Sequence, residues 1–242
     1  MAGIRTDTPD LRWCRLWPIA FRDLPFSQRF QKYQEITLKV IPANDPRPET
    51  LRPQPDTLKL GKILSTANGW SARRRLVEPL LVESMCEIAR RQQADGTSLG
   101  VFRPAEVDRL KIVPDDTNWN DAQQAAMGQI SLFAPSKSKL KRLPYRFQYH
   151  YRCSDRSCPG HEQSIIDWEL GQAWLGWEKY DEAERLRMIR KKWQDELCSP
   201  DRDVCFFVGN MRIHPQNFLV LGVFWPPRQS LASPAQLPLD LG

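Results

Sequence analysis

The sequence predicts an α+β fold built from many short elements. The chain has 242 residues, with twenty prolines against twelve glycines, and this composition favours short strands and helices with stiff connections. Alternating apolar and polar residues indicate several strands, while other segments repeat apolar residues at helical spacing. We expect an N-terminal part that forms a small β-barrel of the OB or PUA type. The C-terminal part should be mixed α/β around a central apolar hairpin.

The N-terminal half combines strand patterns with one long helix. Alternation predicts the strands, as in EITLKVIPA, where every other residue is apolar. The expected strands cover residues 11–21, 35–43, 58–66, 98–103 and 109–114. Helices are expected over 26–34 and 71–93, and Pro79 should kink the longer one or end its first turn. A proline-rich loop is expected over 44–57.

The C-terminal half predicts a strand, two helices and a hairpin. YRFQYHYRC, over 145–153, alternates like a strand. Ser164 and Asp167 fit a capping box that opens the first helix, and the second is expected over 181–197. DVCFFVGN and FLVLGVFW are the most apolar runs of the chain. We therefore expect these two runs to form an antiparallel pair in the centre of the core.

These elements divide into four expected parts. They are a β-rich N-terminal domain with one long helix over 1–114, a basic connector over 115–145, a C-terminal α+β domain over 146–227 and a flexible tail over 228–242. The boundary follows from the connector, where SKSKLKRLP is polar, basic and ends at a proline.

The composition favours a soluble protein with an anionic partner. There are 35 Lys and Arg against 29 Asp and Glu, a net charge of +6, and such an excess promotes association with nucleic acid. The start of the chain lacks the apolar segment of a signal peptide, and no apolar run is long enough to span a membrane. The six cysteines are unevenly spaced, which predicts a reducing cytoplasm and no disulfide framework.

The densest group of metal-binding residue types lies in HYRCSDRSCPGH. Cys153, Cys158 and His161 follow the pattern C-x4-C-x2-H, and Zn²⁺ is commonly held by four such side chains. The pattern lacks a fourth ligand. Candidates for this ligand are His150, Cys198 and His214. His150 would need a bulge, because residues three apart on a flat strand point to opposite faces.

Two other interpretations of this segment remain open. The cysteines could be free thiols that flank a tight turn, or one of them could be a redox or nucleophilic cysteine. The remaining cysteines lie in or beside apolar runs, where a free thiol acts as a small apolar side chain. These expected packing residues are Cys14, Cys86, Cys198 and Cys205.

A metal-dependent nuclease is an alternative interpretation of the same region. His161, Asp167 and Glu169 are residue types that bind Mg²⁺ and activate water. Against this, Asp167 is explained by the helix cap, and no lysine completes the pattern D-x-E-x-K of a common nuclease core.

Three basic segments are candidates for nucleic-acid contacts. Near the N-terminus, arginines alternate with tryptophans, which can hold phosphates and stack bases. The same residues could instead form a barrel wall from which arginines reach solvent. The candidates are Arg12, Trp13, Arg15 and Trp17 near the N-terminus, Lys137, Lys139, Lys141 and Arg142 in the connector, and Arg190, Lys191 and Lys192 in the second C-terminal helix.

The connector also contains a possible docking peptide. Residues 129–133, QISLF, resemble the peptide Gln-Leu-(Ser/Asp)-Leu-Phe by which bacterial DNA-processing proteins bind the replicase sliding clamp, with Ile in the second position here. Gln129, Leu132 and Phe133 would make the contacts. Alternatively, Leu132 and Phe133 are core residues.

Longer segments resemble a family of uncharacterised prokaryotic proteins. They are AGI…WCRLWPIAFRDL at the start, YRFQYHYRC with the following CPGHEQSIIDWE, and DVCFFVGNMRIHPQNFLVLGVFWPP near the end. The resemblance carries no activity, so it implies no catalytic residue.

Taken together, the sequence favours a nucleic-acid-binding protein in DNA or RNA processing or in antiviral defence, which acts beside a separate catalytic partner or the sliding clamp. The metal-dependent nuclease remains an alternative. A structural subunit of a larger complex is another, for which the nine tryptophans offer some support.

Overall fold

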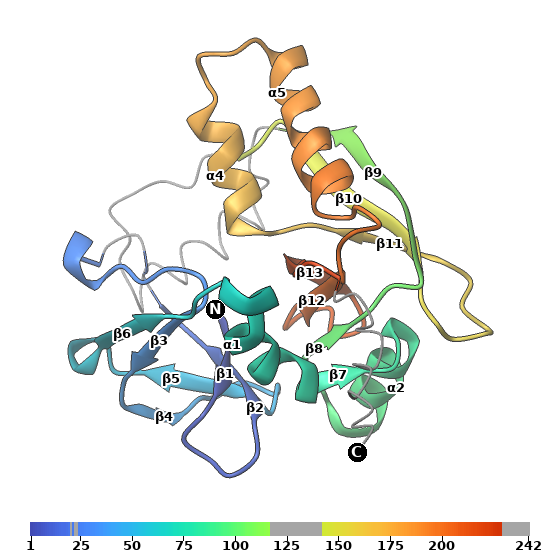
Figure 1. The fold of residues 1–242 in the computed structure, drawn as a ribbon. Coiled ribbons are helices and arrows are strands. Elements are labelled where there is room, and N and C mark those ends of the chain that lie inside the picture. Colours follow the sequence, from blue (N-terminus) through green and yellow to red (C-terminus); the bar gives the residue numbers. More distant parts are fainter. Residues whose placement is uncertain (20, 22–23, 117–141, 229–242) are drawn as a thin grey trace, which may run out of the picture.

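The computed structural model describes residues 1–19, 21, 24–116 and 142–228 (Figure 1). These residues form both helices and sheets, so the expected α+β class is confirmed. The strands belong to four separate sheets, and none of the sheets closes into a barrel within the described ranges. The small N-terminal barrel expected from the sequence is therefore replaced there by open sheets.

The N-terminal strands form two of these sheets. The strands are β1 (Ala2–Arg5), β2 (Arg12–Leu16), β3 (Gln34–Thr37), β4 (Val40–Pro42), β5 (Thr50–Pro53) and β6 (Lys59–Ile63). One sheet has the order β1-β2-β5-β4, in which β2 and β5 run parallel, and the other pairs β3 with β6. The first of these sheets joins segments that are distant in the sequence.

Three N-terminal expectations are corrected by the structure. The helix expected over 26–34 is only the 3-10 turn η2 (Phe26–Gln28). The strand expected over 35–43 is divided into β3 and β4, and the loop over 44–57 contains β5 and the 3-10 turn η3 (Pro55–Thr57). Strands β4 and β5 each end on a proline, and β4 is an edge strand, where proline is tolerated. A proline-rich composition was therefore compatible with strands.

The helix expected over 71–93 is two helices. The elements in this region are α1 (Ala67–Val77), the 3-10 turn η4 (Glu78–Leu80), β7 (Leu81–Val82) and α2 (Met85–Asp95). Pro79 follows the end of α1, since proline cannot continue the helical hydrogen bonds. Ser84 starts α2 because its side chain accepts a hydrogen bond of 3.0 Å from the N–H of Glu87.

The remaining strands and helices follow α2 in the sequence. They are β8 (Leu99–Phe102), β9 (Glu106–Pro114), β10 (Tyr145–Arg152), β11 (His161–Ser164), α4 (Trp168–Gly176), α5 (Glu182–Arg190), the π-helical segment η5 (Lys191–Glu196), β12 (Cys205–Asn210) and β13 (Phe218–Phe224). The predicted antiparallel hairpin is confirmed as β12 and β13. Ser164 lies in β11 and does not cap a helix, whereas Asp167 caps α4 by accepting from the N–H of Glu169.

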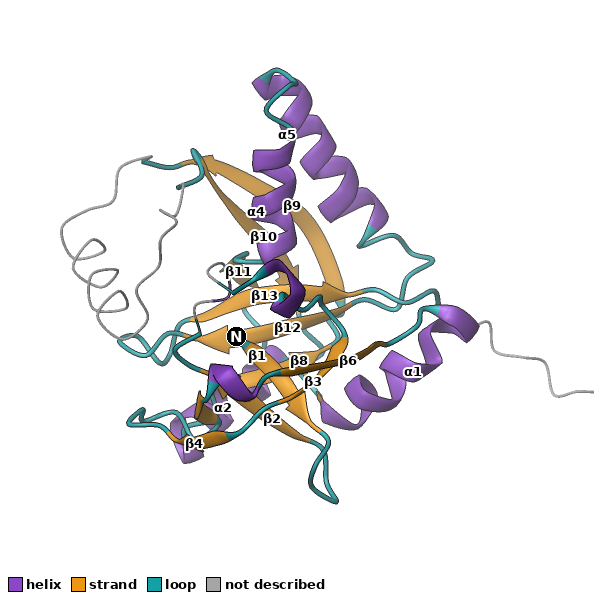
Figure 2. Cartoon of the chain, turned by 90° about the vertical axis from the view of Figure 1, so that its left-hand side faces the viewer, coloured by secondary structure: helices purple, strands orange, loops and turns teal. Residues whose placement is uncertain are grey.

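Two sheets built from the strands β7 to β13 enclose the main core. Their orders are β11-β10-β9 and β13-β12-β8-β7. Alternate residues of β10, Phe147, Tyr149 and Tyr151, are almost fully buried, and the ring of Tyr149 stacks on Phe206 of β12 at 4.7 Å between centroids. Burial of each such ring contributes about 1.5–3 kcal/mol. Trp174 of α4 packs on Tyr145 at 5.4 Å, and Figure 2 shows α4 and α5 beside one another.

The connector joins neighbouring strands. Pro114 at the end of β9 pairs with Tyr145 at the start of β10, so the two ends of the segment between them lie side by side. No helix in the described part of the chain has the length and apolar character needed to cross a bilayer.

Candidate metal centre

Four side chains bring metal-binding atoms together between α2 and the hairpin of β10 and β11. The ligand atoms of Cys86, Cys153, Cys158 and His161 all lie within 4.8 Å of one another. The predicted proximity of the last three is confirmed. We refer to these four residues as the Cys3His cluster.

The spacing of the Cys3His cluster fits a tetrahedral ion. The sulfurs of Cys86 and Cys153 are 3.6 Å apart, and Nε2 of His161 is 3.5 Å from each of them. With Zn–S bonds of about 2.3 Å and Zn–N bonds of about 2.0–2.1 Å, a tetrahedron requires about 3.8 Å between sulfurs and about 3.6 Å from sulfur to nitrogen. Cys86, Cys153 and His161 therefore already have nearly the separations that an ion would impose, and Cys158 lies within 4.8 Å of them.

The turn after β10 positions Cys158. The side chain of Asp155 accepts hydrogen bonds from the N–H and the hydroxyl of Ser157, at 2.9 and 2.6 Å, and Cys158 N–H donates to the carbonyl of Asp155 at 3.0 Å. Gly160 has a φ of +91°, which favours glycine, and its N–H donates to the sulfur of Cys158 at 3.4 Å. These contacts direct the Cys158 thiol towards the start of β11.

Contacts from α2 hold this turn in place. Arg90 donates to Asp155 at 2.9 Å and to Glu87 at 3.0 Å, and the hydroxyl of Ser154 donates to the carbonyl of Glu83 at 2.7 Å. The ring of His161 stacks on that of Tyr151, with centroids 5.1 Å apart. Protein contacts therefore bring the ligands of the Cys3His cluster close together.

The thiols of the Cys3His cluster have shifted pKa values. Burial alone would raise the pKa of Cys153, but hydrogen bonds with the backbone of Cys86 and Asp155 and with the side chains of His161 and Cys158 lower it to about 6. Burial, together with the neighbouring Cys153, raises the pKa of Cys86 to about 12. A cation between the sulfurs would stabilise both thiolates, because a metal ion deprotonates the thiols that bind it.

Cys86 is the residue that sequence reasoning missed. It was expected to be a packing residue, but it lies in the first turn of α2 with its sulfur in the cluster. The sequence signal was Ser84-x-x-Glu87, a capping-box pattern that places a helix start at Ser84. Thiolates are favoured at helix N-termini, so this pattern places Cys86 at a favourable position, but it does not show which residues the thiol meets.

The three other candidates for the fourth ligand lie elsewhere. His150 is on the outer face of β10, where its Nδ1 lies 2.6 Å from a carboxylate oxygen of Asp108. A register shift follows it in the pairing with β9, yet it still faces away from Tyr149 and Tyr151. The thiol of Cys198 donates a hydrogen bond to the carbonyl of Trp193, and His214 is exposed in the turn between β12 and β13. None of these three belongs to the cluster.

The residues of the nuclease alternative are not gathered into one site. Lys32 lies 3.5 Å from Asp167 and 2.8 Å from Glu169, whereas His161 belongs to the Cys3His cluster. Burial raises the pKa of Asp167, and Lys32 opposes this shift. Within the described ranges, the Cys3His cluster is the one group of three or more such side chains with metal-ligand spacing.

The nucleic-acid candidates near the N-terminus differ in their surroundings. Trp13 packs edge-on against Phe207 with centroids 6.0 Å apart. Arg15 donates to the carbonyl and hydroxyl of Ser98, and burial lowers its pKa to about 10. Arg12 and Trp17 are exposed, and 38% of the surface of Trp17 is accessible to solvent.

The other candidates lie on the connector and on α5 with η5. Arg142 is paired with Asp115 at 3.1 Å, Arg190 donates to the carbonyl of Leu110 at 3.0 Å, and Lys192 is paired with Glu196 at 2.9 Å. Lys191 is exposed. Candidates outside the described residues are Lys137, Lys139, Lys141, Gln129, Leu132 and Phe133.

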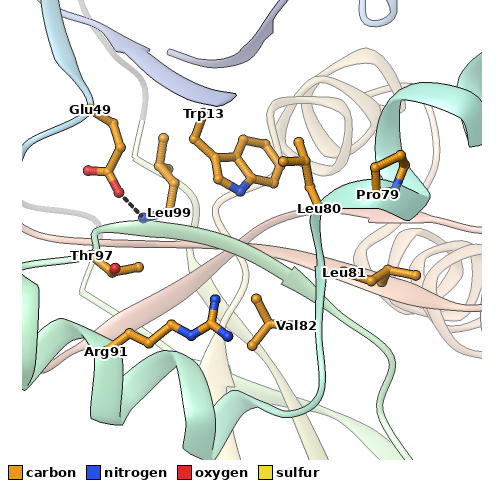
Figure 3. A pocket seen from close by; sticks show the side chains of 9 residues that line it. All are labelled: Trp13, Glu49, Pro79, Leu80, Leu81, Val82, Arg91, Thr97 and Leu99. Atoms are coloured by element: carbon orange, nitrogen blue, oxygen red, sulfur yellow. Dashed lines mark hydrogen bonds between the residues drawn. The ribbon is translucent and has the colours of Figure 1, made fainter. Parts of the chain in front are cut away.

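A cavity of about 250 Å³ lies between Trp13 and the segment from Pro79 to Val82 (Figure 3). Its charged groups already have partners. Glu49 accepts from the N–H of Leu99 at 3.3 Å, and Arg91 is paired with Glu87 at 2.9 Å. The Cys3His cluster, whose groups converge on one point, is therefore the better candidate site.

Two family models match the chain. The model described as Domain of unknown function (DUF8757) matches residues 82–239, and the model described as Domain of unknown function (DUF8758) matches residues 1–79. The first match contains all four residues of the Cys3His cluster. No curated protein and no solved structure matches the chain.

Proposed function

We propose that this chain, which belongs to the DUF8757 family, binds one Zn²⁺ ion through the Cys3His cluster. The observation that carries the proposal is the convergence of three sulfurs and one imidazole nitrogen within 4.8 Å. Thiolate and imidazole ligands favour Zn²⁺ over Mg²⁺ and Ca²⁺, which prefer oxygen ligands. All six cysteines are free thiols, which fits a reducing cytoplasm.

The role proposed for the ion is structural. Four protein ligands complete a tetrahedron and leave no position for water, unlike a catalytic zinc site with three protein ligands. The ion would join the start of α2 to the turn between β10 and β11, two segments that are far apart in the sequence. The ion would then contribute to folding and would not take part in a reaction.

Elemental analysis of protein purified without a metal-affinity tag tests this proposal. We expect about one zinc per chain for the wild type and less than about a tenth of an equivalent for Cys86→Ser, which removes one of the four ligands. Cys198→Ser is the matched control, because Cys198 is a cysteine outside the cluster. It should keep its zinc. A wild-type chain without zinc, in which all six thiols titrate freely, would contradict the proposal.

Nucleic-acid binding is a second candidate function, in DNA or RNA processing or antiviral defence beside a separate catalytic partner. The net charge of +6 supports it, as do Arg109, Arg146 and Arg152, which are exposed on one sheet and make no salt bridge within the described residues. Binding to DNA and RNA across a salt series tests it, since affinity for phosphates falls steeply with salt. No binding to any of them at low salt would contradict it.

A further inference from the structure

The sheet of β9, β10 and β11 has one buried face and one outer face. Phe147, Tyr149 and Tyr151 of β10 point into the core, so the alternate residues of β10 lie on the outer face. The strand register places Arg109 opposite His150 on this face. The basic residues of the outer face are Arg109, Lys111, Arg146, His150 and Arg152.

Two of these basic residues contact acidic side chains, and the three arginines make no salt bridge to a described residue. Lys111 is paired with Glu162 at 2.9 Å, and His150 with Asp108 at 2.6 Å. The three arginines are exposed and make no salt bridge to any described residue. Glu106 stands opposite Arg152 in the register, and Asp115, near Arg146, is already paired with Arg142.

The spacing of the arginines suits several phosphates. Same-face neighbours along a strand are about 6–7 Å apart, so Arg146 and Arg152 are separated by about 20 Å. Arg109 extends the row to the neighbouring strand, where facing residues are about 5 Å apart. Each guanidinium offers paired donors that match phosphate oxygens.

The outer face also lacks the side chains that stack bases. Along the described strands β9, β10 and β11, its residues are basic, acidic, polar or valine, and the aromatic rings of β10 lie on the buried face. Single-strand binding usually requires such rings, whereas duplexes can be held through their phosphates alone.

We propose that the outer face of this sheet binds the phosphate backbone of duplex nucleic acid without reading its bases. The inference rests on the nucleic-acid-binding function proposed above, and it names the surface and the strandedness. Arg152 directly precedes the zinc-ligand candidate Cys153, so the Cys3His cluster would hold one end of this surface in place.

The test uses the full chain, a mixed-sequence DNA duplex and a single strand of equal length, with binding measured by fluorescence anisotropy over a salt series. The variant R109Q/R146Q/R152Q should weaken duplex binding about tenfold or more. The plot of log affinity against log salt should become shallower, and the magnitude of its slope should fall by about three. The matched control R52Q/R75Q/R212Q removes the same charge from exposed residues outside this sheet. It should change the slope by about one or less.

The outcomes distinguish an error in the assigned surface from an error in the proposed nucleic-acid-binding function. A wild-type chain that binds the duplex while both triple variants lose affinity equally would overturn the surface and leave nucleic-acid binding standing. Tighter wild-type binding to the single strand would overturn the duplex assignment. A wild-type chain that binds neither DNA probe at low salt, nor RNA in the same two forms, would overturn the function itself. Zinc content and thermal unfolding, unchanged in both variants, confirm that they are folded.

Discussion

At the scale of single residues, strand alternation decides which histidine can reach the metal. His150 and Tyr151 are neighbours on β10, but Tyr151 is fully buried beside His161 while His150 pairs with Asp108 on the outer face. His161 starts the next strand on the buried side, opposite Tyr151. Only His161 therefore presents its imidazole to the sulfurs.

We expect the two histidines to respond differently to substitution. His161→Ala should lower bound zinc from about one equivalent to less than about a tenth, because it removes a ligand. His150→Ala should keep the zinc and change the free energy of unfolding by less than about 1 kcal/mol, since its contact with Asp108 is partly exposed. Elemental analysis and denaturant unfolding measure both effects. Loss of zinc in the His150 variant alone would show that the ligand assignment is wrong.

At the scale of elements, an ion network around the half-buried Asp203 links α1 to the β13-β12-β8-β7 sheet. Arg74 of α1 is buried and donates to Asp203 at 2.8 Å, and Arg103, which follows β8, donates to the same carboxylate at 2.7 Å. Burial opposes ionisation of Asp203, but hydrogen bonds from Arg103 and Arg74 lower its pKa below the usual value. The network joins the segment before β12 to two other elements.

Asp203→Asn should destabilise the chain by about 1.5–3 kcal/mol at pH 7, because the carboxylate accepts hydrogen bonds from two guanidinium groups. Arg74 keeps its pair with Glu78 at 2.6 Å in this variant. The pKa of Asp203 is lower in the folded chain than in the unfolded chain. The contribution of Asp203 is therefore present above the unfolded value, about pH 4, and is lost as pH falls through the folded value.

Urea unfolding of the wild type and Asp203→Asn between pH 3 and pH 7 measures this contribution, and the difference in free energy should narrow below about pH 4. Asp7→Asn is a control, because Asp7 is exposed in its pair with Arg5. It should have little effect on unfolding at any of these pH values. An equal destabilisation by Asp203→Asn throughout the range would show that its charge is not responsible.

At the scale of the whole molecule, the Cys3His cluster connects segments that share no strand pairing. Cys86 and Cys153 are 67 residues apart in the sequence. The cluster lies at the edge of the main core, whose buried residues include Cys153 and Tyr151. A bound ion would therefore stabilise the contact between α2 and the β9–β10–β11 sheet against separation. Its removal should affect the unfolding of the molecule, beyond the turn itself.

A strong chelator should lower the melting temperature of the wild type by on the order of 10 °C. This estimate combines about 4 kcal/mol for a ligand at a thousand times its dissociation constant with about 2–4 °C per kcal/mol for a chain of this size. The Cys86→Ser variant should melt at the lower temperature with or without chelator. Calorimetry measures both. A chelator effect of the same size in the variant would place the responsible metal elsewhere.

Local patterns in the sequence determined part of this architecture. The turn between Cys153 and His161 is short, so its own geometry brings those ligands together wherever the hairpin packs. The apolar runs of β12 and β13 and the helix of α5 also follow from their residue patterns, because period and composition act over a few residues. The α+β class of the chain was predictable for the same reason.

Only the tertiary structure decided the fourth ligand and the separation of the other acidic and basic groups. Cys86 has an ordinary sequence context, and it becomes a ligand because α2 packs against the end of β10. In the same way, the parallel pairing of β2 with β5 and the contact of Lys32 with Asp167 join residues that are far apart in the chain. Such pairings depend on which apolar faces are buried together, and no local pattern contains that information.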